Sequence, residues 1–379
     1  MFDFLFPGRE YFLVVIILPD KLSGAFLALN KDKTIIPKKT RESKDWAELV
    51  KHFRLDRFKG PVIFAADSSM ASTVLVPIDV IRDNPALPLG DVELENLLSQ
   101  AVGRVFNQCR EQAAVELQVD DLEMVLAGSK VTNFKVDDHR VISPLGFQAK
   151  RIGAVFEITF ALRSVLEDIK QFLGERRDFF FGELGRAELL ALEKIQKPPI
   201  GFLDLKTTGR SFSFLMDRAA IGHVIYRREF KWNPYSFRNK IAEYFEVSKD
   251  AAYKLYEAYI QGQTSETVRR FLNRIGKPAI QEFLAAVKQA KLKGQVYINS
   301  PVTLPFSLPY RAHKIIFNEP PLNFLLEQLG FRIEPVEWPM PPFQILRHLA
   351  PFFDYYYNRS DSTINRWLKR RLSWLGSIG

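Results

Sequence analysis

The sequence has little cysteine and little histidine. Its 379 residues include one cysteine, Cys109, and five histidines. A single cysteine has no partner for an intrachain disulfide, which excludes a disulfide-stapled secreted module and is typical of a reducing cytoplasm. Cys109 lies in an apolar helical pattern, so we expect a small core residue. The histidines are scattered without the spacing of metal ligands, so we expect no metal site.

Long apolar runs are also absent. The longest, residues 11–18, stops at Pro19, whereas a helix needs about twenty residues to cross a bilayer. We therefore expect no membrane-spanning segment. Asp3 stands where a secretory signal carries basic residues, so we expect no such signal either.

Motifs of self-contained catalysis are missing. The chain contains no Walker A sequence, no His-Glu-x-x-His and no Gly-x-Ser-x-Gly. What it does have is positive charge, because 53 Lys and Arg residues against 44 Asp and Glu residues give a formal charge of +9. Such an excess favours an acidic partner. No aromatic-basic platform or helix-turn-helix pattern is present, so we do not expect nucleic acid.

Short β-branched runs alternate with helical patterns, which predicts an α/β protein. Strands are expected at 12–18 and 24–29 around a polar turn, and again at 200–205 and 211–216. The repeated hairpin predicts a duplicated lobe.

Two further regions stand apart in the pattern. A long amphipathic helix beginning at Asp91 and the strands after it predict a compact α+β unit inserted into the larger body. Residues 233–293 are almost entirely helical in pattern, with helices expected at 237–245, 249–259, 265–275 and 277–292.

Three segments carry a resemblance to a known family. Residues 142–147 (Ile-Ser-Pro-Leu-Gly-Phe) are similar to the Asn-Pro-hydrophobic-Gly segment of the inserted FtsA subdomain. Residues 201–204, with Thr207 and Thr208, resemble the strand and second phosphate loop of the actin-like superfamily, and 248–252 fall where the family starts a helix. The chain thus resembles, divergently, the FtsA and PilM branch of the actin-like proteins.

The resemblance implies a two-lobed actin-like (ribonuclease H-like) α/β fold, with a small α+β subdomain inserted in the first lobe and a helical subdomain in the second. The implied division is the first lobe at 1–75 and 163–197, the inserted subdomain at 76–162, the second lobe at 198–232 and 294–357, the helical subdomain at 233–293, and a linker with a terminal amphipathic helix at 358–379.

The loops that bind ATP and magnesium in the superfamily are eroded here. The first, at 18–21, has Pro19 in place of a backbone donor and no glycine. The third, at 299–301, reads Asn-Ser-Pro instead of Gly-Gly. The second keeps one glycine, and its residues, if nucleotide binding is retained, are Asp204, Lys206, Thr207, Thr208, Gly209 and Arg210. We expect a pseudo-ATPase without cofactor or catalytic residues; the alternative binds ATP and magnesium.

The C-terminal stretch, residues 362–379, carries the clearest functional pattern. On a helix its apolar residues fall within an arc of about 160° opposite a basic face, although Arg371 projects into the apolar side. Two tryptophans, leucines, basic residues and no acid are typical of a helix lying in a membrane interface. The expected membrane-binding residues are Ile364, Arg366, Trp367, Leu368, Lys369, Arg370, Arg371, Leu372, Trp374, Leu375 and Ile378. Packing of the same stripe on the protein's own body is the alternative.

A second basic stretch, 218–240, has a net charge of +5. The family resemblance implies that the nearby helical subdomain receives the acidic C-terminal peptide of the tubulin homologue FtsZ. The candidate partner-binding residues are Arg227, Arg228, Lys231, Arg238 and Lys240. A solvated surface is the alternative interpretation.

These expectations combine into one function. The chain is expected to be an FtsA-like cell-division scaffold, peripheral on the inner face of the bacterial membrane, that polymerises and links FtsZ to it. Repeated copies in a filament would supply the avidity that one short helix lacks. The alternatives are an ATP-binding filament former with weak ATPase activity and a PilM-like platform for type IV pilus assembly.

Overall fold

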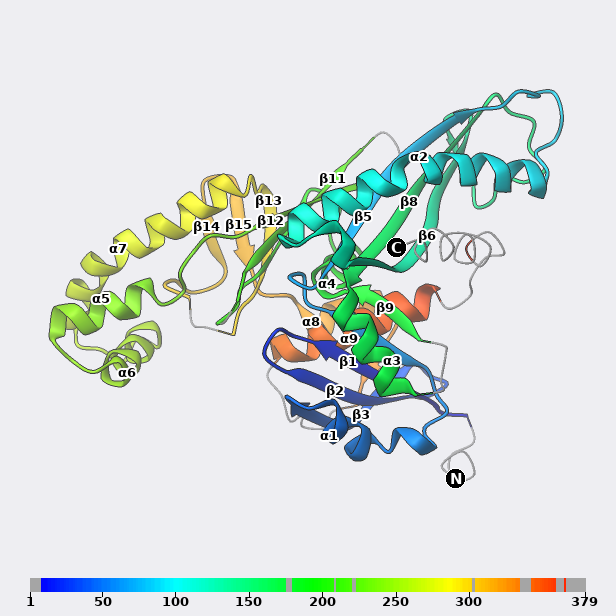
Figure 1. The fold of residues 1–379 in the computed structure, drawn as a ribbon. Helices are drawn as coiled ribbons and strands as arrows, with labels where there is room; N and C mark the ends of the chain where they lie inside the picture. Colours follow the sequence, from blue (N-terminus) through cyan, green and yellow to red (C-terminus); the bar gives the residue numbers. More distant parts are fainter. Residues whose placement is uncertain are drawn as a thin grey trace. The chain divides into compact units, whose positions relative to one another are not determined.

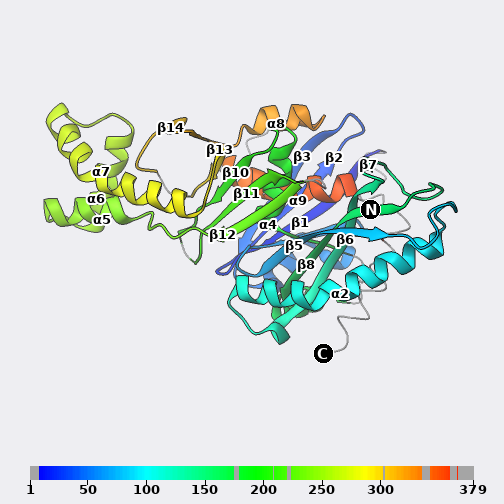
Figure 2. The same ribbon diagram turned by 90° about the horizontal axis from the view of Figure 1, so that it is seen from above.

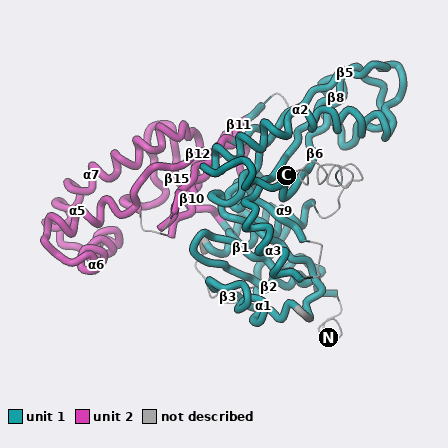
Figure 3. The backbone as a smooth tube through the Cα atoms, in the orientation of Figure 1, with its two compact units in different colours: residues 1–195, 218–225, 322–379 teal, residues 196–217, 226–321 magenta. Residues whose placement is uncertain are grey.

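The computed structural model describes residues 8–174, 179–207, 209–219, 223–301, 304–334, 342–358 and 365. The chain divides into two compact units, which Figure 3 colours separately. The first unit comprises residues 1–195, 218–225 and 322–379, and the second comprises residues 196–217 and 226–321. Each unit contains a six-stranded mixed sheet (Figure 1).

The sheet of the first unit has the strand order β16-β3-β2-β1-β4-β9. The strands are β1 (Glu10–Ile17), β2 (Leu22–Leu29), β3 (Thr34–Ser43), β4 (Val62–Ala66), β9 (Phe180–Glu183) and β16 (Arg332–Ile333). Strand β1 is antiparallel to β2 and parallel to β4, and β4 is parallel to β9. The predicted hairpin of β1 and β2 is confirmed.

Helices cover both faces of this sheet. On one face α4 (Leu184–Glu193), α8 (Leu322–Gln328) and α9 (Pro342–Asn358) share an apolar core with β1 and β2. On the other face α1 (Trp46–Phe53) and α3 (Arg163–Leu173) do the same, with the short 3-10 helix Leu55–Arg57 beside them. A strand buried on both faces needs apolar residues on both, which is why β1 and β4 are continuous apolar runs without alternation.

The inserted subdomain is a four-stranded antiparallel sheet of order β5-β8-β6-β7. It contains β5 (Ala71–Ile81), α2 (Asp91–Leu117), the 3-10 helix Asp121–Glu123, β6 (Met124–Val136), β7 (His139–Arg140) and β8 (Arg151–Leu162). Helix α2 lies along β5, β8 and β6 (Figure 2). Cys109 lies on the buried face of α2, as predicted, and burial raises the pKa of its thiol to about 11.

The sheet of the second unit has the order β12-β11-β10-β13-β15-β14. Its strands are β10 (Ile200–Asp204), β11 (Phe212–Arg218), β12 (His223–Glu229), β13 (Gly294–Asn299), β14 (Tyr310–Ala312) and β15 (Ile315–Asn318). Strand β10 is antiparallel to β11 and parallel to β13, which is parallel to β15. A hairpin followed by two parallel strands therefore occurs in both sheets. This repeated topology is that of the actin-like, ribonuclease H-like fold, so the predicted fold class is confirmed.

The helical region of the second unit comprises α5 (Ser236–Phe245), α6 (Lys249–Ile260) and α7 (Glu266–Gln289). The sequence predicted a break near Gly276, but α7 is one continuous helix that includes Pro278. Gly276 allows a close approach, because a Cβ atom there would lie 2.6 Å from Cζ of Phe237 on α5. Packing of this apolar face on α5 offsets the hydrogen bond that proline removes.

Residues 322–358 also differ from expectation. The sequence assigned 294–357 to the second lobe, whereas the structure places Leu322–Gly379 in the first unit. There β16 pairs with β3, and Leu349 and Phe352 of α9 lie in the core of the first sheet. An apolar helix face fits either sheet, so its periodicity did not identify which sheet it covers.

One buried histidine on α9 makes the first unit sensitive to acid. His348 donates through Nδ1 to the carbonyl of Gln344 at 2.9 Å, and its Nε2 lies 3.1 Å from Oγ of Ser23 on β2. Burial lowers the pKa of this imidazole below its ordinary value. The folded chain therefore holds His348 neutral.

We expect the free energy of unfolding to fall as the pH drops below about 6.5, the ordinary histidine pKa. Below that pH the unfolded chain takes up a proton that folded His348 refuses, and above it this contribution is fully present. Urea titrations between pH 7.5 and pH 5 give the free energy of unfolding at each pH. The slope of this free energy against pH should be smaller in His348→Gln, by at most ~1.4 kcal/mol per pH unit. Identical slopes in both proteins would contradict this assignment.

Candidate functional site

Polar side chains stand at the carboxyl ends of the parallel strands in the second unit. Asp204 ends β10 and Asn299 ends the neighbouring β13, and the two residues are paired in register. Both are fully buried. Ligand sites of open α/β sheets lie at this edge, and burying polar groups is costly unless they are partnered. The edge of β10 and β13 is therefore the candidate functional site.

Lys206 occupies this site from within the chain. Its ammonium Nζ lies 3.3 Å from Oδ2 of Asp204, and both side chains are buried. The backbone around it is fixed as well, because the Lys206 N–H donates to Oγ of Ser211 at 3.0 Å and the Leu205 N–H donates to the carbonyl of Asn299 at 2.9 Å. A lysine thus neutralises the carboxylate at the end of β10.

Three cations surround one aromatic ring beside this pair. Nζ of Lys206 lies 5.3 Å from the centroid of the Phe212 ring, and the guanidinium carbons of Arg210 and Arg227 lie 5.5 and 4.5 Å from it. Phe212 is the first residue of β11 and is buried. Such contacts stabilise desolvated cations. Lys206 and Arg210 of the turn between β10 and β11, and Arg227 of β12, are therefore packed around the first residue of β11.

The residues at this edge do not fit a magnesium ion. Mg²⁺ requires carboxylate or other oxygen ligands, and the Asp204 carboxylate is already paired with an ammonium group. Within the described ranges, no group of three or more His, Cys, Asp or Glu side chains is placed to hold a metal. Thr207 and Gly209 are exposed in the turn, and Thr208 lies outside the described residues.

The corresponding edge of the first unit is occupied by local structure. After β1, the Leu18 N–H donates to the carbonyl of Lys21 at 2.9 Å, which closes the turn through Pro19. Asp67, directly after β4, is fully buried, and its Oδ1 accepts from N and Oγ of Ser69 at 2.8 and 2.6 Å. Two of the N–H groups that a phosphate could contact in this turn are therefore not on offer, because that of Leu18 is used and Pro19 has none.

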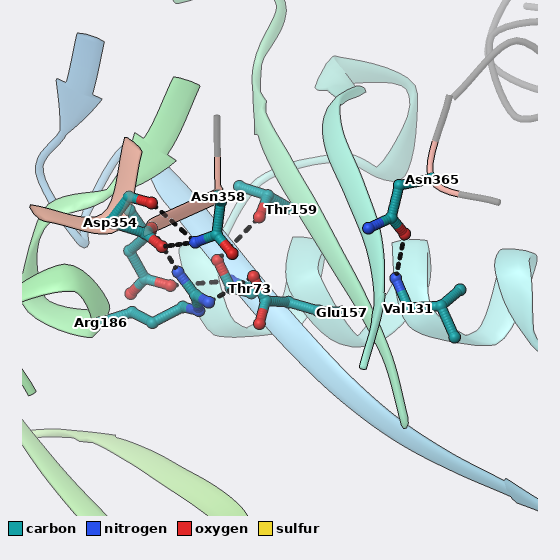
Figure 4. Close-up of polar contacts among 9 residues, drawn as sticks. Thr73, Val131, Glu157, Thr159, Arg186, Asp354, Asn358 and Asn365 are labelled. Atoms are coloured by element: carbon teal, nitrogen blue, oxygen red, sulfur yellow. Dashed lines mark hydrogen bonds and ion pairs between the residues drawn. The ribbon is translucent and has the colours of Figure 1, made fainter. Parts of the chain in front are cut away.

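A buried ionic cluster, which sequence reasoning missed, joins the inserted subdomain to the first sheet (Figure 4). Arg186 on α4 pairs with Glu157 on β8 and, at 3.0 Å, with Asp354 on α9. Burial alone would lower the pKa of Arg186, but the two carboxylates raise it. The only sequence signal was the presence of Arg186 and Glu188 in a helix that is mostly apolar. We refer to Arg186, Glu157 and Asp354 as the Arg186 cluster.

Neighbouring polar groups extend the Arg186 cluster. Oε2 of Glu183, at the end of β9, accepts from the Thr73 N–H on β5 at 2.8 Å. Nδ2 of Asn358 donates to Oδ1 of Asp354 at 2.8 Å. Oγ1 of Thr73 lies 3.0 Å from Oγ1 of Thr159. The carboxylates of the first unit thus hold its strands and helices together.

The candidate partner-binding residues make contacts within the second unit. Arg227 lies over Phe212, Arg228 donates to the carbonyl of Gln289 at 3.2 Å, and Lys240 pairs with Glu282 at 3.0 Å. Arg238 lies 4.3 Å from the ring of Tyr235. Lys231 is exposed. Their role in partner binding stays a prediction.

All the expected membrane-binding residues lie outside the described residues. Asn365 is described, and its Oδ1 accepts from the Val131 N–H on β6 at 2.8 Å. Among the described helices, none is both long and apolar enough to cross a bilayer.

No protein-family model and no curated protein matches the chain. Solved structures resemble its fold. A PilM-PilN type IV pilus biogenesis complex is 12% identical, covers 92% of this chain and 96% of its own, and has a TM-score of 0.44. A ROK family protein from Streptococcus pneumoniae in complex with sucrose is 8% identical, covers 93% and 100%, and has a TM-score of 0.39.

A Bacteroides thetaiotaomicron protein with an actin-like ATPase fold and unknown function is 10% identical, covers 80% of this chain and 86% of its own, and has a TM-score of 0.34. Likenesses this distant carry no functional conclusion. The actin-like fold follows from the strand order of the two sheets.

The pairing of Lys206 with Asp204 predicts a specific stability pattern. Lys206→Met should lower the stability of the second unit by about 3–5 kcal/mol, because it leaves a buried carboxylate without its ammonium partner. The double variant Asp204→Asn, Lys206→Met removes both charges and should recover most of this loss. Hydrogen exchange of the β10 and β13 amides measures the effect on this unit alone.

Lys254→Met is the matched control, because Lys254 is an exposed lysine in the same unit. It should change exchange at β10 and β13 little. A Lys206→Met protein as stable as its parent would refute the structural role of the pair. So would a double variant no more stable than Lys206→Met.

Proposed function

We propose that this chain is an actin-like scaffold protein that holds partner proteins at a membrane and does not turn over nucleotide. The proposal that the chain does not turn over nucleotide rests on the buried pair of Lys206 and Asp204. The family resemblance implies that Asp204 belongs to a phosphate-binding loop, and here the ammonium group of Lys206 lies beside its carboxylate. The closed turn at Leu18–Lys21 supports the same proposal, because the N–H of Leu18 is used within the turn and Pro19 has none.

Membrane attachment is proposed from the C-terminal sequence. Residues 362–379 contain four basic side chains and two tryptophans, and they contain no acidic residue. Each basic residue near an anionic leaflet contributes about 1 kcal/mol. The proposed location is the cytoplasmic face of the bacterial membrane, and self-association into filaments would supply avidity.

The first candidate for the partner is FtsZ, which makes the chain an FtsA-like cell-division tether. Supporting features are the subdomain inserted between β4 and β9 and the helical region of α5, α6 and α7. The acidic FtsZ tail is complementary in charge to residues 218–240.

A second candidate is a PilM-like platform for pilus assembly. The hydrogen bond between Asn365 and Val131 favours it, because it places Asn365 against the protein's own β6. A platform protein needs no membrane helix of its own.

Vesicle sedimentation tests the proposal. The full chain should sediment with vesicles that contain anionic lipid and should carry FtsZ with it. A variant ending at residue 358 should lose sedimentation while its fold is unchanged, because the basic and aromatic residues are removed. High salt should weaken both steps, since they depend on charge.

A second variant replaces Trp367 and Trp374 with alanine and keeps every basic residue, so it separates the apolar contribution from that of charge. Its sedimentation should fall strongly, because interfacial binding needs the apolar face as well as the charge. Unchanged sedimentation of the shortened chain would defeat membrane attachment. Binding of PilN in place of FtsZ would select the pilus candidate.

A further inference from the structure

Strand β6 has an edge that the rest of its sheet leaves open. Along one side β6 pairs with β8 over most of its length. Along the other side, within the described sheet, it pairs only with the short β7, at Lys135 and Val136. Residues 125–130 are accordingly half-buried. An open strand edge presents backbone groups that bind other chain segments.

Asn365 contacts this edge. Its Oδ1 accepts from the Val131 N–H at 2.8 Å, across 234 positions of sequence. In Figure 4 the Asn365 side chain points at the β6 backbone, at a distance from the Arg186 cluster. The Val131 side chain belongs to the core under α2. The donor is therefore held rigidly by the sheet, and the acceptor comes from the C-terminal stretch.

The segments on both sides of this contact are basic in sequence. Strand β6 carries Lys130 and Lys135 and no acidic residue. The stretch that contains Asn365 is also basic, with Arg366 and Lys369 close to it in sequence. Two basic segments repel each other, so a neutral carboxamide is the group suited to join them. An anionic surface attracts the same stretch.

We propose that Asn365 docks the C-terminal stretch on the open edge of β6, and that this docking competes with attachment of the same stretch to an anionic membrane. The competition rests on the membrane attachment proposed above, whereas the docking does not. The docked form keeps the stretch on the inserted subdomain, and anionic lipid releases it. The contact thereby sets a threshold of anionic lipid for attachment.

Hydrogen exchange of the full chain without lipid tests the docking. Asn365→Ala should speed exchange of the Val131 amide at least ~5-fold, the factor that one hydrogen bond supplies. Asn365→Asp keeps an acceptor oxygen and should retain the protection. Asn84→Ala, an exposed asparagine in the same unit, is the control and should leave Val131 unchanged. Unchanged exchange in Asn365→Ala overturns the docking.

Titration with vesicles of neutral and anionic phospholipid tests the competition. Asn365→Ala should bind about fivefold more tightly than the parent, because the docked form no longer competes. Equal affinities overturn the competition. If neither protein binds vesicles while Val131 exchange still responds to Asn365→Ala, the proposed membrane attachment fails and the docking stands.

Discussion

The carboxyl ends of parallel strands meet at one edge of a sheet, and in each unit of this chain that edge carries buried charged or amide side chains. Such groups need partners, because a charge buried without one costs several kcal/mol. At the end of β10 the partner is a lysine of the chain itself. Because Lys206 is paired with Asp204, this carboxylate is already engaged and is not free to hold a magnesium ion.

The first unit meets the same constraint with other partners. Asp67 accepts from the turn that leads into β5, and Glu183 accepts from the backbone of β5. Arg186 joins β8 to α9 through two carboxylates. Ions of this kind specify an arrangement more than they stabilise it. We regard the polar edge of the first unit as the means of fixing the inserted subdomain on the first sheet.

Periodicity and turn residues predicted the two hairpins, helix α2 and the inserted sheet, because each depends on residues that are near in sequence. The strands β3 and β9 were missed. Strand β3 is mostly polar outside Ile35 and Ile36, and β9 is only four residues long. Neither the position of α9 nor the continuity of α7 through Pro278 could be predicted, since both depend on packing against distant residues.

The candidate site was predicted in part. Asp204 and Lys206 were named from a weak resemblance, but their ion pair depends on side-chain placement that spacing does not specify. The pair of Arg186 and Asp354 and the contact between Asn365 and Val131 each join residues more than a hundred positions apart. No local pattern predicts such contacts.

We propose that the chain's own lysine fills the edge of β10 and β13 and that this edge does not bind nucleotide. Calorimetric titration of the full chain with ATP, with and without magnesium, tests it most directly. The account predicts no saturable heat in either titration. Micromolar affinity that depends on magnesium would contradict it.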